Sequence, residues 1–304
     1  MASSASAPAL SISGLHKAYG KHAVLNDLEL RVERGSIQGL VGLNGSGKTT
    51  TLECVLGLRK FDRGEVRLLH QSPANLYAAR GRIVAIFDTP SLNPNLTVRQ
   101  CLQQAALLLD HPIQDFSRVE ALLGLEQYTD FRIKQLSLGN KRRASIAQAL
   151  LADPELILLD EPFNGLDAGG VDDILQLIKT LNAESGTTFM LSSHQLPYLE
   201  KICSHIAILH GGRIAVNGAI DELLGSRQVI KLLSPDQGAV KTLLASMEGI
   251  TILAEQDGYL SLECRSMDSA ELNTRLVNHS IAVAELIREK ASLETLFRKI
   301  TGAR

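Results

Sequence analysis

The feature that most constrains this chain is the spacing of three glycines, a lysine and a threonine in residues 42–49, which read Gly-Leu-Asn-Gly-Ser-Gly-Lys-Thr. An apolar run, residues 36–43, leads into this segment, and apolar side chains at helical spacing follow in residues 48–58. This order predicts a strand, a glycine-rich loop and a helix. Such a loop turns its backbone N–H groups toward phosphate oxygens, and the helix N-terminus adds partial positive charge. We therefore expect a site for a nucleotide phosphate chain.

Two side chains at the end of this loop carry specific chemistry. Lys48 is expected to hold the β- and γ-phosphates. Thr49 is expected to offer its hydroxyl to Mg²⁺, a hard cation that prefers oxygen ligands. A flexible turn without function is the alternative, but the strand before the loop and the helix after it favour phosphate binding.

A second chemical segment begins with the apolar run 156–159 and ends in Asp160-Glu161-Pro162. The run predicts a buried strand. Asp160 at the end of that strand is expected to face Mg²⁺, and Glu161 is placed to orient or deprotonate a water molecule. Without the glycine-rich loop, a solvated strand end would explain the two carboxylates equally well.

A third segment, Leu-Ser-Leu-Gly-Asn at residues 136–140, opens a predicted helix over residues 141–151. A polar, glycine-containing helix start is suited to bind an anion. The basic cluster Lys141, Arg142 and Arg143 comes directly after it. We interpret this cluster as a solvated helix face, with a phosphate or partner contact as the alternative.

Composition excludes several classes of protein. The chain has 304 residues, of which 45% are hydrophobic, and its formal net charge is −2. This balance is typical of a globular protein of about two domains and gives no electrostatic reason to bind nucleic acid. No apolar run approaches the roughly 20 residues of a membrane-spanning helix, and the four cysteines are too widely spaced for a zinc site. We expect a cytoplasmic protein.

The order of predicted elements divides the chain in two. Strands at residues 36–43, 155–159 and 187–191 alternate with helices and predict a mostly parallel sheet. A helical insertion is expected over about residues 90–151, and a hairpin at residues 205–216 closes a first domain, residues 10–225. Residues 1–9 are predicted to form a disordered tail.

Residues 226–304 show a different order of elements. We expect strand 229–233, helix 237–247, a hairpin of strands 250–254 and 259–264, helix 269–278, strand 281–287 and a closing helix 293–300. The order βαββαβ predicts a small ferredoxin-like α+β domain. Because this domain contains none of the chemical segments, we expect a regulatory or dimer-contact role, with a passive appendage as the alternative.

Over residues 10–225 these motifs resemble the nucleotide-binding subunit of an ATP-binding cassette (ABC) transporter, with its P-loop NTPase cassette fold. Residues 42–49 resemble Walker A, residues 156–160 resemble Walker B, and residues 136–140 resemble the LSGGQ signature. The resemblance implies that Glu161 is the catalytic glutamate.

Three further positions match the same family. Residues 165–167 occupy the D-loop position, and His194 resembles the switch histidine. Tyr19 falls where the family stacks an aromatic ring on adenine, although a half-buried strand residue is the alternative. The ATP-binding set implied by the resemblance is Tyr19, Gly42, Asn44, Gly45, Ser46, Gly47, Lys48, Thr49, Thr50, Ser137, Gly139, Asn140 and Asp167.

The resemblance also implies partners. Two copies of such a subunit sandwich two ATP molecules with Mg²⁺, each site joining the Walker motifs of one copy to the signature of the other. The homodimer would drive a transmembrane permease subunit and lie on the inner face of the cell membrane. A soluble ABC-type ATPase that clamps DNA or ribosomes is the alternative function, and a small-molecule kinase would leave the signature and His194 unexplained.

Two departures from the common family pattern stand out. The signature carries Leu138 in place of glycine and Asn140 in place of glutamine. The Q-loop carries Asp88 where many members carry glutamine, which resembles a branch that includes peptide-antibiotic export and immunity transporters. Asp88 either ligates Mg²⁺, together with Thr49 and Asp160, or caps the loop.

Overall fold

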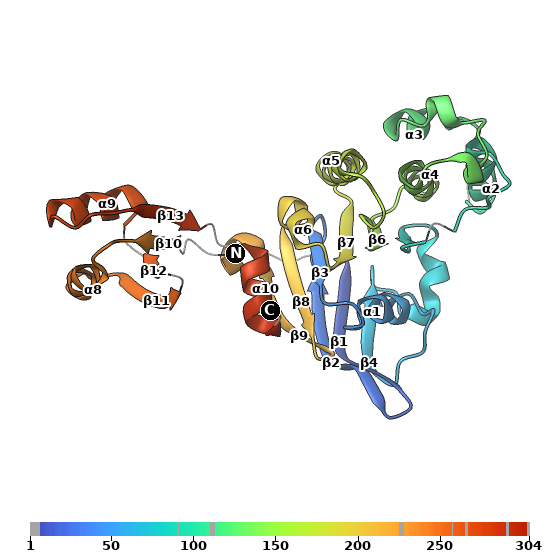
Figure 1. Ribbon diagram of the computed structural model, residues 1–304. Helices are drawn as coiled ribbons and strands as arrows, with labels where there is room; N and C mark the ends of the chain where they lie inside the picture. Colours follow the sequence, from blue (N-terminus) through green and yellow to red (C-terminus); the bar gives the residue numbers. More distant parts are fainter. Residues whose placement is uncertain are drawn as a thin grey trace, which may run out of the picture. The chain divides into compact units, whose positions relative to one another are not determined.

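The computed structural model describes residues 7–89, 91–109, 113–224, 228–256, 258–264, 267–289 and 292–302. It divides into two compact units, Met1–Ala219 and Ile220–Arg304, which are treated separately below (Figure 1). Of the predicted tail 1–9, residues 1–6 lie outside the described residues. Ala9 is already buried, and its N–H donates to the carbonyl oxygen of Val32 at 2.9 Å, so ordered chain begins before residue 10.

The centre of the first unit is a six-stranded sheet with the order β5-β6-β7-β3-β8-β9. All neighbours are parallel except the hairpin of β8 and β9, which confirms the mostly parallel sheet. Strands β3, β6 and β7 are buried at every residue, as expected for strands covered on both faces. The strands are β3 (Ile37–Val41), β5 (Ile83–Ile86), β6 (Leu156–Asp160), β7 (Thr188–Ser193), β8 (His205–His210) and β9 (Arg213–Ala219).

A second sheet of the first unit is antiparallel, with the order β2-β1-β4. Its strands are β1 (Leu10–Tyr19), β2 (His22–Val32) and β4 (Arg63–Leu68). Helix α1 (Lys48–Val55) contacts β4 of this sheet and β6 and β7 of the other. One apolar core therefore holds side chains from both sheets and from α1, such as Leu28, Leu40 and Leu52.

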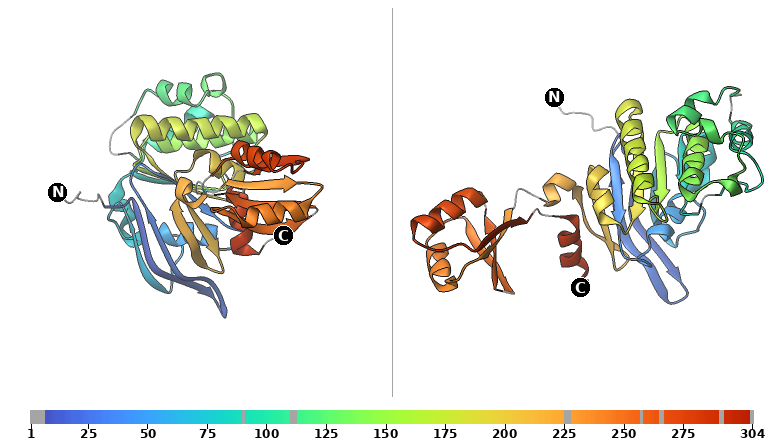
Figure 2. Two further views of the ribbon diagram at one scale, coloured as in Figure 1. Left: turned by 90° about the vertical axis from the view of Figure 1, so that its left-hand side faces the viewer. Right: turned by 45° about the horizontal axis from the view of Figure 1, so that its top comes forward.

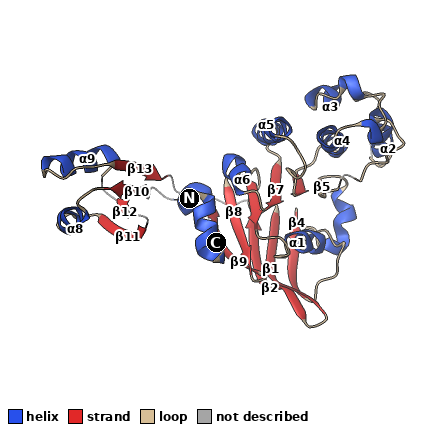
Figure 3. Ribbon diagram, in the orientation of Figure 1, coloured by secondary structure: helices blue, strands red, loops and turns tan. Residues whose placement is uncertain are grey.

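Helices dominate the described residues of the segment 90–151, as predicted (Figure 3). Helix α2 begins with a reciprocal capping box between Thr97 and Gln100, and it packs against α4. The helices here are α2 (Val98–Ala106), α3 (Ser117–Leu122) and α4 (Leu138–Leu150), with short 3₁₀ turns at Glu126–Tyr128 and Ile133–Gln135; a further 3₁₀ helix, Pro73–Ala79, lies between β4 and β5. Helices α5 (Ala168–Ser185) and α6 (Leu196–Ile202) follow β6 and β7 and pack on the six-stranded sheet (Figure 2).

The second unit contains a four-stranded antiparallel sheet with the order β11-β12-β10-β13. Together with the chain order βαββαβ, this is the ferredoxin-like arrangement that the sequence predicts. Helices α8 and α9 supply Val240 and Leu272 to its apolar core. The elements are α7 (Ile220–Leu224), β10 (Gln228–Leu233), α8 (Gln237–Ala245), β11 (Ile250–Gln256), β12 (Tyr259–Cys264), α9 (Ser269–Asn278), β13 (Glu285–Glu289) and α10 (Leu293–Thr301).

One predicted strand of the second unit is misplaced. The prediction was a strand over residues 281–287, but β13 begins at Glu285. Ser280 has a φ of 59°, and the N–H of Ile281 donates to the carbonyl oxygen of Leu276 at 3.0 Å. The N–H of Ile281 thus caps the C-terminus of α9, and its side chain is buried in the core, which the apolar pattern alone does not distinguish from a strand.

Among the described residues, we find no helix that combines the length and the continuous apolar character needed to span a bilayer.

Candidate functional site

The glycine-rich loop connects the end of β3 to the start of α1. Gly45 and Gly47 have φ angles of 77° and 108°, which residues with a side chain rarely adopt. A Cβ atom on Gly42 would lie 2.3 Å from Oγ of Ser46. Gly47 is the N-cap of α1 and no side chain caps the helix, so its first N–H groups are free to bind phosphate oxygens. The local geometry therefore fits a triphosphate.

Lys48 is buried directly behind this loop, with 6% of its surface exposed. Its Nζ donates to the carbonyl oxygens of Gly42 at 2.8 Å and Leu43 at 3.3 Å. The same Nζ lies 3.2 Å from Oε1 of Glu161 at the end of β6. A buried ammonium group is tolerated only where such acceptors surround it. Lys48 therefore links the glycine-rich loop to the end of β6 through these contacts of its ammonium group.

Asp160, the last residue of β6, is 3% exposed. Its Oδ2 accepts a hydrogen bond from Oγ1 of Thr49 at 2.9 Å, and its Oδ1 accepts one from the hydroxyl of Ser192 on β7. A hydroxyl and a carboxylate that lie side by side are the hard oxygen ligands that Mg²⁺ prefers. Thr49 and Asp160 thus form a donor set that fits this cation.

Glu161 is buried and has a φ of 46°, a strained backbone conformation for a residue with a side chain. Its carboxylate accepts a hydrogen bond from Oγ of Ser193 at 3.0 Å and lies 3.0 Å from Nδ1 of His194. Burial by itself raises the pKa of Glu161, but the hydrogen bond with His194 and the charge of Lys48 outweigh it, and the pKa lies below its usual value. The carboxylate is therefore kept ionised, as a group that orients or activates water must be.

The signature and D-loop positions lie on other elements of the first unit. Ser137 is the N-cap of α4 and accepts a hydrogen bond from the N–H of Asn140 at 3.2 Å. Asp167 is the N-cap of α5 and accepts one from the N–H of Gly170 at 2.9 Å. Among the described residues, Ser137, Gly139, Asn140 and Asp167 form no hydrogen bond with the glycine-rich loop.

The unusual leucine of the signature contacts the D-loop of the same chain. Gly165 has a φ of 70°, and a Cβ atom placed on it would lie 2.5 Å from Cδ2 of Leu138. Leu138 thus occupies the space that a side chain at position 165 would need. The departure at position 138 is accommodated because the facing D-loop residue is glycine.

Tyr19 and Thr50 are predicted nucleotide contacts outside the central cluster. Tyr19 ends β1 and is 44% exposed, with Nζ of Lys17 at 5.0 Å and Cζ of Arg59 at 5.5 Å from its ring centroid. Both cations lie within the range of cation–π attraction. Thr50 lies half-buried in the first turn of α1. Stacking on adenine remains a prediction for Tyr19.

The basic cluster after the signature is not a solvated face, which corrects our interpretation. Arg142 is 1% exposed, and its Nη1 donates to the carbonyl oxygen of Phe87 at 2.9 Å. Its Nη2 lies 3.5 Å from Oδ1 of Asp88. Arg143 pairs with Asp173 on α5. The helical pattern places these residues toward neighbouring elements, which a short charge run cannot reveal.

Sequence reasoning missed the supporting roles of Ser192, Ser193 and Arg142. Both serines are fully buried and hold the carboxylates of Asp160 and Glu161. Polar residues at the end of a strand that is otherwise apolar were the available signal. For Arg142 the only signal was its place within a basic cluster.

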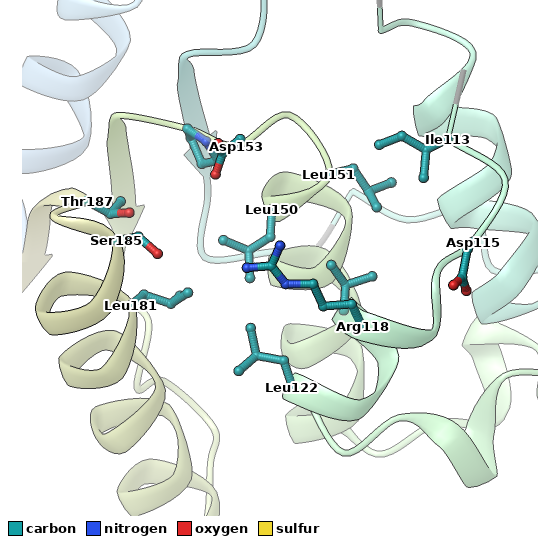
Figure 4. Close-up of a pocket in the computed structure, with 12 residues that line it drawn as sticks. Ile113, Asp115, Arg118, Leu122, Leu150, Leu151, Asp153, Leu181, Ser185 and Thr187 are labelled. Atoms are coloured by element: carbon teal, nitrogen blue, oxygen red, sulfur yellow. The ribbon is translucent and has the colours of Figure 1, made fainter. Parts of the chain in front are cut away.

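A pocket of about 290 Å³ lies away from this site, between α3, the end of α4 and α5 (Figure 4). Leucines such as Leu122, Leu150 and Leu181 line it, and Arg118 extends between them. None of the predicted nucleotide-binding or catalytic residues contributes to its lining. The pocket therefore adds nothing to the phosphate site.

Comparisons with known proteins show which family the chain is similar to. Residues 25–164 match the family model described as ABC transporter. The chain is 32% identical to the bacitracin transport ATP-binding protein BcrA of Bacillus licheniformis, over 95% of each chain. It is also 32% identical to the Nod factor export ATP-binding protein I of Ralstonia nicotianae, over 98% of this chain and 95% of that protein.

Solved structures show the same fold in the first unit. A structure described as the ATP-binding subunit of an ABC transporter is 30% identical, with a TM-score of 0.64 over 70% of this chain and 91% of that chain. A dimeric, post-hydrolysis ATP-binding cassette bound to ADP and Pi is 25% identical, with a TM-score of 0.63 over 69% of this chain and 98% of that chain.

Proposed function

Because the chain belongs to the ABC transporter family as an ATP-binding subunit, and is accordingly an ATPase, we propose that it drives export through a separate transmembrane permease. The observation that carries the proposal is the cluster in which the buried Lys48 and Glu161 meet the exposed His194, beside Thr49 and Asp160. An export role is supported by relatives whose names specify bacitracin transport and Nod factor export. The alternative of a clamp on DNA or ribosomes is not favoured.

We assign the phosphate-binding role to the glycine-rich loop. Backbone N–H groups of Gly45, Ser46 and Gly47, with the start of α1, would surround the phosphates, and Lys48 would hold the β- and γ-phosphates. Gly42, Asn44 and Thr50 complete the loop and the first helical turn, and Tyr19 would stack on adenine.

Thr49 and Asp160 would hold Mg²⁺, which when bound neutralises charge that develops on the phosphate oxygens. Glu161 positions water and accepts its proton at the carboxylate, because Lys48 and His194 keep that carboxylate ionised. Ser193 fixes the orientation of Glu161 by its hydrogen bond at 3.0 Å. Asp88 is the remaining carboxylate that we predicted near the metal.

The signature residues would act on a second copy of the chain. Ser137, Gly139 and Asn140 at the start of α4, with Asp167 of the D-loop, do not hydrogen-bond to the glycine-rich loop of their own chain. We therefore assign them to the nucleotide held by the partner in a homodimer. Such a dimer, bound to its permease, would lie at the inner face of the membrane.

Dimerisation of a hydrolysis-deficient variant tests this function. We expect Glu161→Gln to bind ATP with an affinity within about threefold of the parent, to lose hydrolysis, and to form a dimer only with ATP, measured by light scattering. Ser137→Arg should bind ATP but remain monomeric, because the obstruction lies on the facing copy. Hydrolysis by Glu161→Gln at the parental rate would refute the role of Glu161.

The permease partner is tested separately. The chain is co-expressed with a candidate membrane protein, sought among the reading frames next to its own coding sequence, and the two are purified in detergent through a tag on the membrane protein. Recovery of the chain at equal stoichiometry, with ATPase activity that responds to the membrane protein, supports the proposal. Failure to co-purify with a membrane protein, together with retention on DNA or ribosomes, would favour the clamp.

A further inference from the structure

Arg142 connects three segments of the first unit. It lies in the second turn of α4, five residues after the N-cap Ser137. Its Nη1 donates to the carbonyl oxygen of Phe87, at the end of β5, at 2.9 Å. Its Nη2 donates to the carbonyl oxygen of Glu161, after β6, at 3.4 Å, and lies 3.5 Å from Oδ1 of Asp88. One guanidinium group therefore contacts both the Q-loop and the backbone of the catalytic glutamate.

Burial makes this arrangement costly to disturb. The Arg142 side chain is 1% exposed, and its buried Nε has no hydrogen-bond partner. Burial lowers the pKa of Arg142, whereas the charge of Asp88 acts to raise it. Asp88 is the one carboxylate within 4.0 Å of the guanidinium among the described residues. A buried cation that loses its counter-charge is strongly destabilised.

The contact with Glu161 bears on the reaction. Glu161 has a φ of 46°, so its backbone requires support from its surroundings. Its carbonyl oxygen accepts hydrogen bonds from the N–H of Asn164 at 3.2 Å and from Arg142 at 3.4 Å. A change in the position of Arg142 would be transmitted to the backbone that carries the catalytic carboxylate.

We propose that Arg142 is a positioning residue through which Asp88 holds the backbone of Glu161, so that Asp88 acts on hydrolysis through this arginine and not as a ligand of Mg²⁺. If Asp88 turned toward the metal, Arg142 would lose the one carboxylate within 4.0 Å of its guanidinium among the described residues. Thr49 and Asp160 already form a donor pair that does not include Asp88. The inference rests on the proposed catalytic role of Glu161.

The test uses the full chain and compares Asp88→Asn, Arg142→Lys, Arg142→Gln and the double variant Asp88→Asn/Arg142→Gln. Measurements are kcat, KM for ATP, and binding of a fluorescent ATP analogue as Mg²⁺ is titrated. We expect Asp88→Asn to lower kcat about tenfold, with KM and the half-saturating Mg²⁺ concentration within about twofold of the parent. Arg142→Lys keeps the positive charge but loses the planar guanidinium with its several N–H donors. Its kcat should therefore lie between that of the parent and that of Arg142→Gln.

Non-additivity gives the second criterion. If both residues act along one path, the double variant should have a kcat within about twofold of Arg142→Gln alone. Arg143→Gln is the matched control, because Arg143 is the neighbouring residue of α4 and pairs with Asp173 on α5 instead. Its kcat should stay within about twofold of the parent.

Several results would overturn the inference. A rise of about tenfold in the half-saturating Mg²⁺ concentration for Asp88→Asn would make Asp88 a metal ligand. An unchanged kcat for Asp88→Asn would show that Asp88 does not act on hydrolysis through Arg142. The same conclusion would follow if the double variant lowered kcat by the product of the two single effects. Should Arg142→Gln fail to fold, Asp88→Asn and Arg142→Lys still decide the question. Failure of the parent chain to hydrolyse ATP, or hydrolysis by Glu161→Gln, would instead refute the proposed function.

Discussion

The two units of this protein place charge differently. In the unit Met1–Ala219, Lys48, Arg142, Asp160 and Glu161 are all buried and contact one another or nearby backbone. In the described part of Ile220–Arg304, Glu263 is the one buried charged side chain, and ion pairs such as Lys241 with Glu255 lie at the surface.

This difference indicates where function is concentrated. Burying a charged group costs free energy unless partners compensate it, so a cluster of such groups marks a place where chemistry requires them. The second unit has the ordinary construction of a folded domain, with apolar side chains inside and charges outside. The comparison predicts that changes to the buried charges of the first unit affect ATP chemistry, whereas changes in the second unit affect folding or assembly.

The largest expected effect is that of Lys48→Ala. Removal of this buried ammonium takes away the phosphate contact and leaves Glu161 without a partner 3.2 Å away. ATP affinity should fall by about 100-fold or more, measured by isothermal titration calorimetry. The matched control is Lys241→Ala in the second unit, whose exposed pair with Glu255 should not affect ATP binding. Retention of ATP affinity by Lys48→Ala would contradict the assignment of the loop.

His194→Ala should give the next largest effect, through the pKa of Glu161. The hydrogen bond at 3.0 Å between Nδ1 of His194 and this carboxylate lowers that pKa. Without it, the pKa of Glu161 should rise, so the fall of kcat on acidification should begin at a higher pH. We expect kcat to drop about tenfold to 100-fold at neutral pH. If kcat falls but the pH at which it declines on acidification stays the same as in the parent, His194 has a role independent of Glu161.

Gly165→Ala should have an intermediate effect. The added Cβ would lie 2.5 Å from Cδ2 of Leu138, at a φ of 70° that alanine adopts with strain. Overpacking of this kind costs about 1–3 kcal/mol, and ATPase activity should fall with the displaced D-loop. Measurements are thermal unfolding and kcat.

Two variants control the Gly165 experiment. Leu138→Gly in the Gly165→Ala background removes the clash, and it should restore part of the thermal stability and part of kcat. Gly169→Ala nearby has open space around its Cβ and no positive φ, so it should change neither. Equal effects of the changes at positions 165 and 169 would argue against a contact between the signature and the D-loop.

The smallest effect on ATP binding is expected for changes in the second unit. Truncation near residue 225 should leave Mg·ATP affinity within about threefold of the parent, because every predicted nucleotide contact lies in the first unit. Leu272→Ala in the full chain should destabilise the second unit by about 2–5 kcal/mol, since Leu272 is fully buried.

Complex yield with the membrane partner decides what the second unit does. A lower yield for both the truncated chain and Leu272→Ala would support a role in subunit pairing or assembly. An unchanged yield would make the unit a passive appendage. Loss of ATP binding by a correctly folded truncated chain would show that the ATP-binding domain extends beyond residue 225.

Local signals were sufficient for most of the fold. Glycine spacing in residues 42–49 and the apolar run before Asp160 identified the loop and the strand that meet at the phosphate site. The order βαββαβ identified the second unit, and the strand order agrees with it. Ile281 misled the prediction because a buried residue at a helix end has the same apolar character as a strand residue.

The sequence by itself determined which residues are candidates for the chemistry, because each motif depends on spacing within a few residues of the chain. Only the tertiary structure decided how distant residues combine. Arg142 is one basic residue among three in the sequence, but folding brings it to Asp88 and to the carbonyl oxygen of Glu161. Leu138 likewise meets Gly165 only after α4 packs beside the loop that follows β6. Such contacts arise from the packing of separate elements, and no local pattern in the chain encodes them.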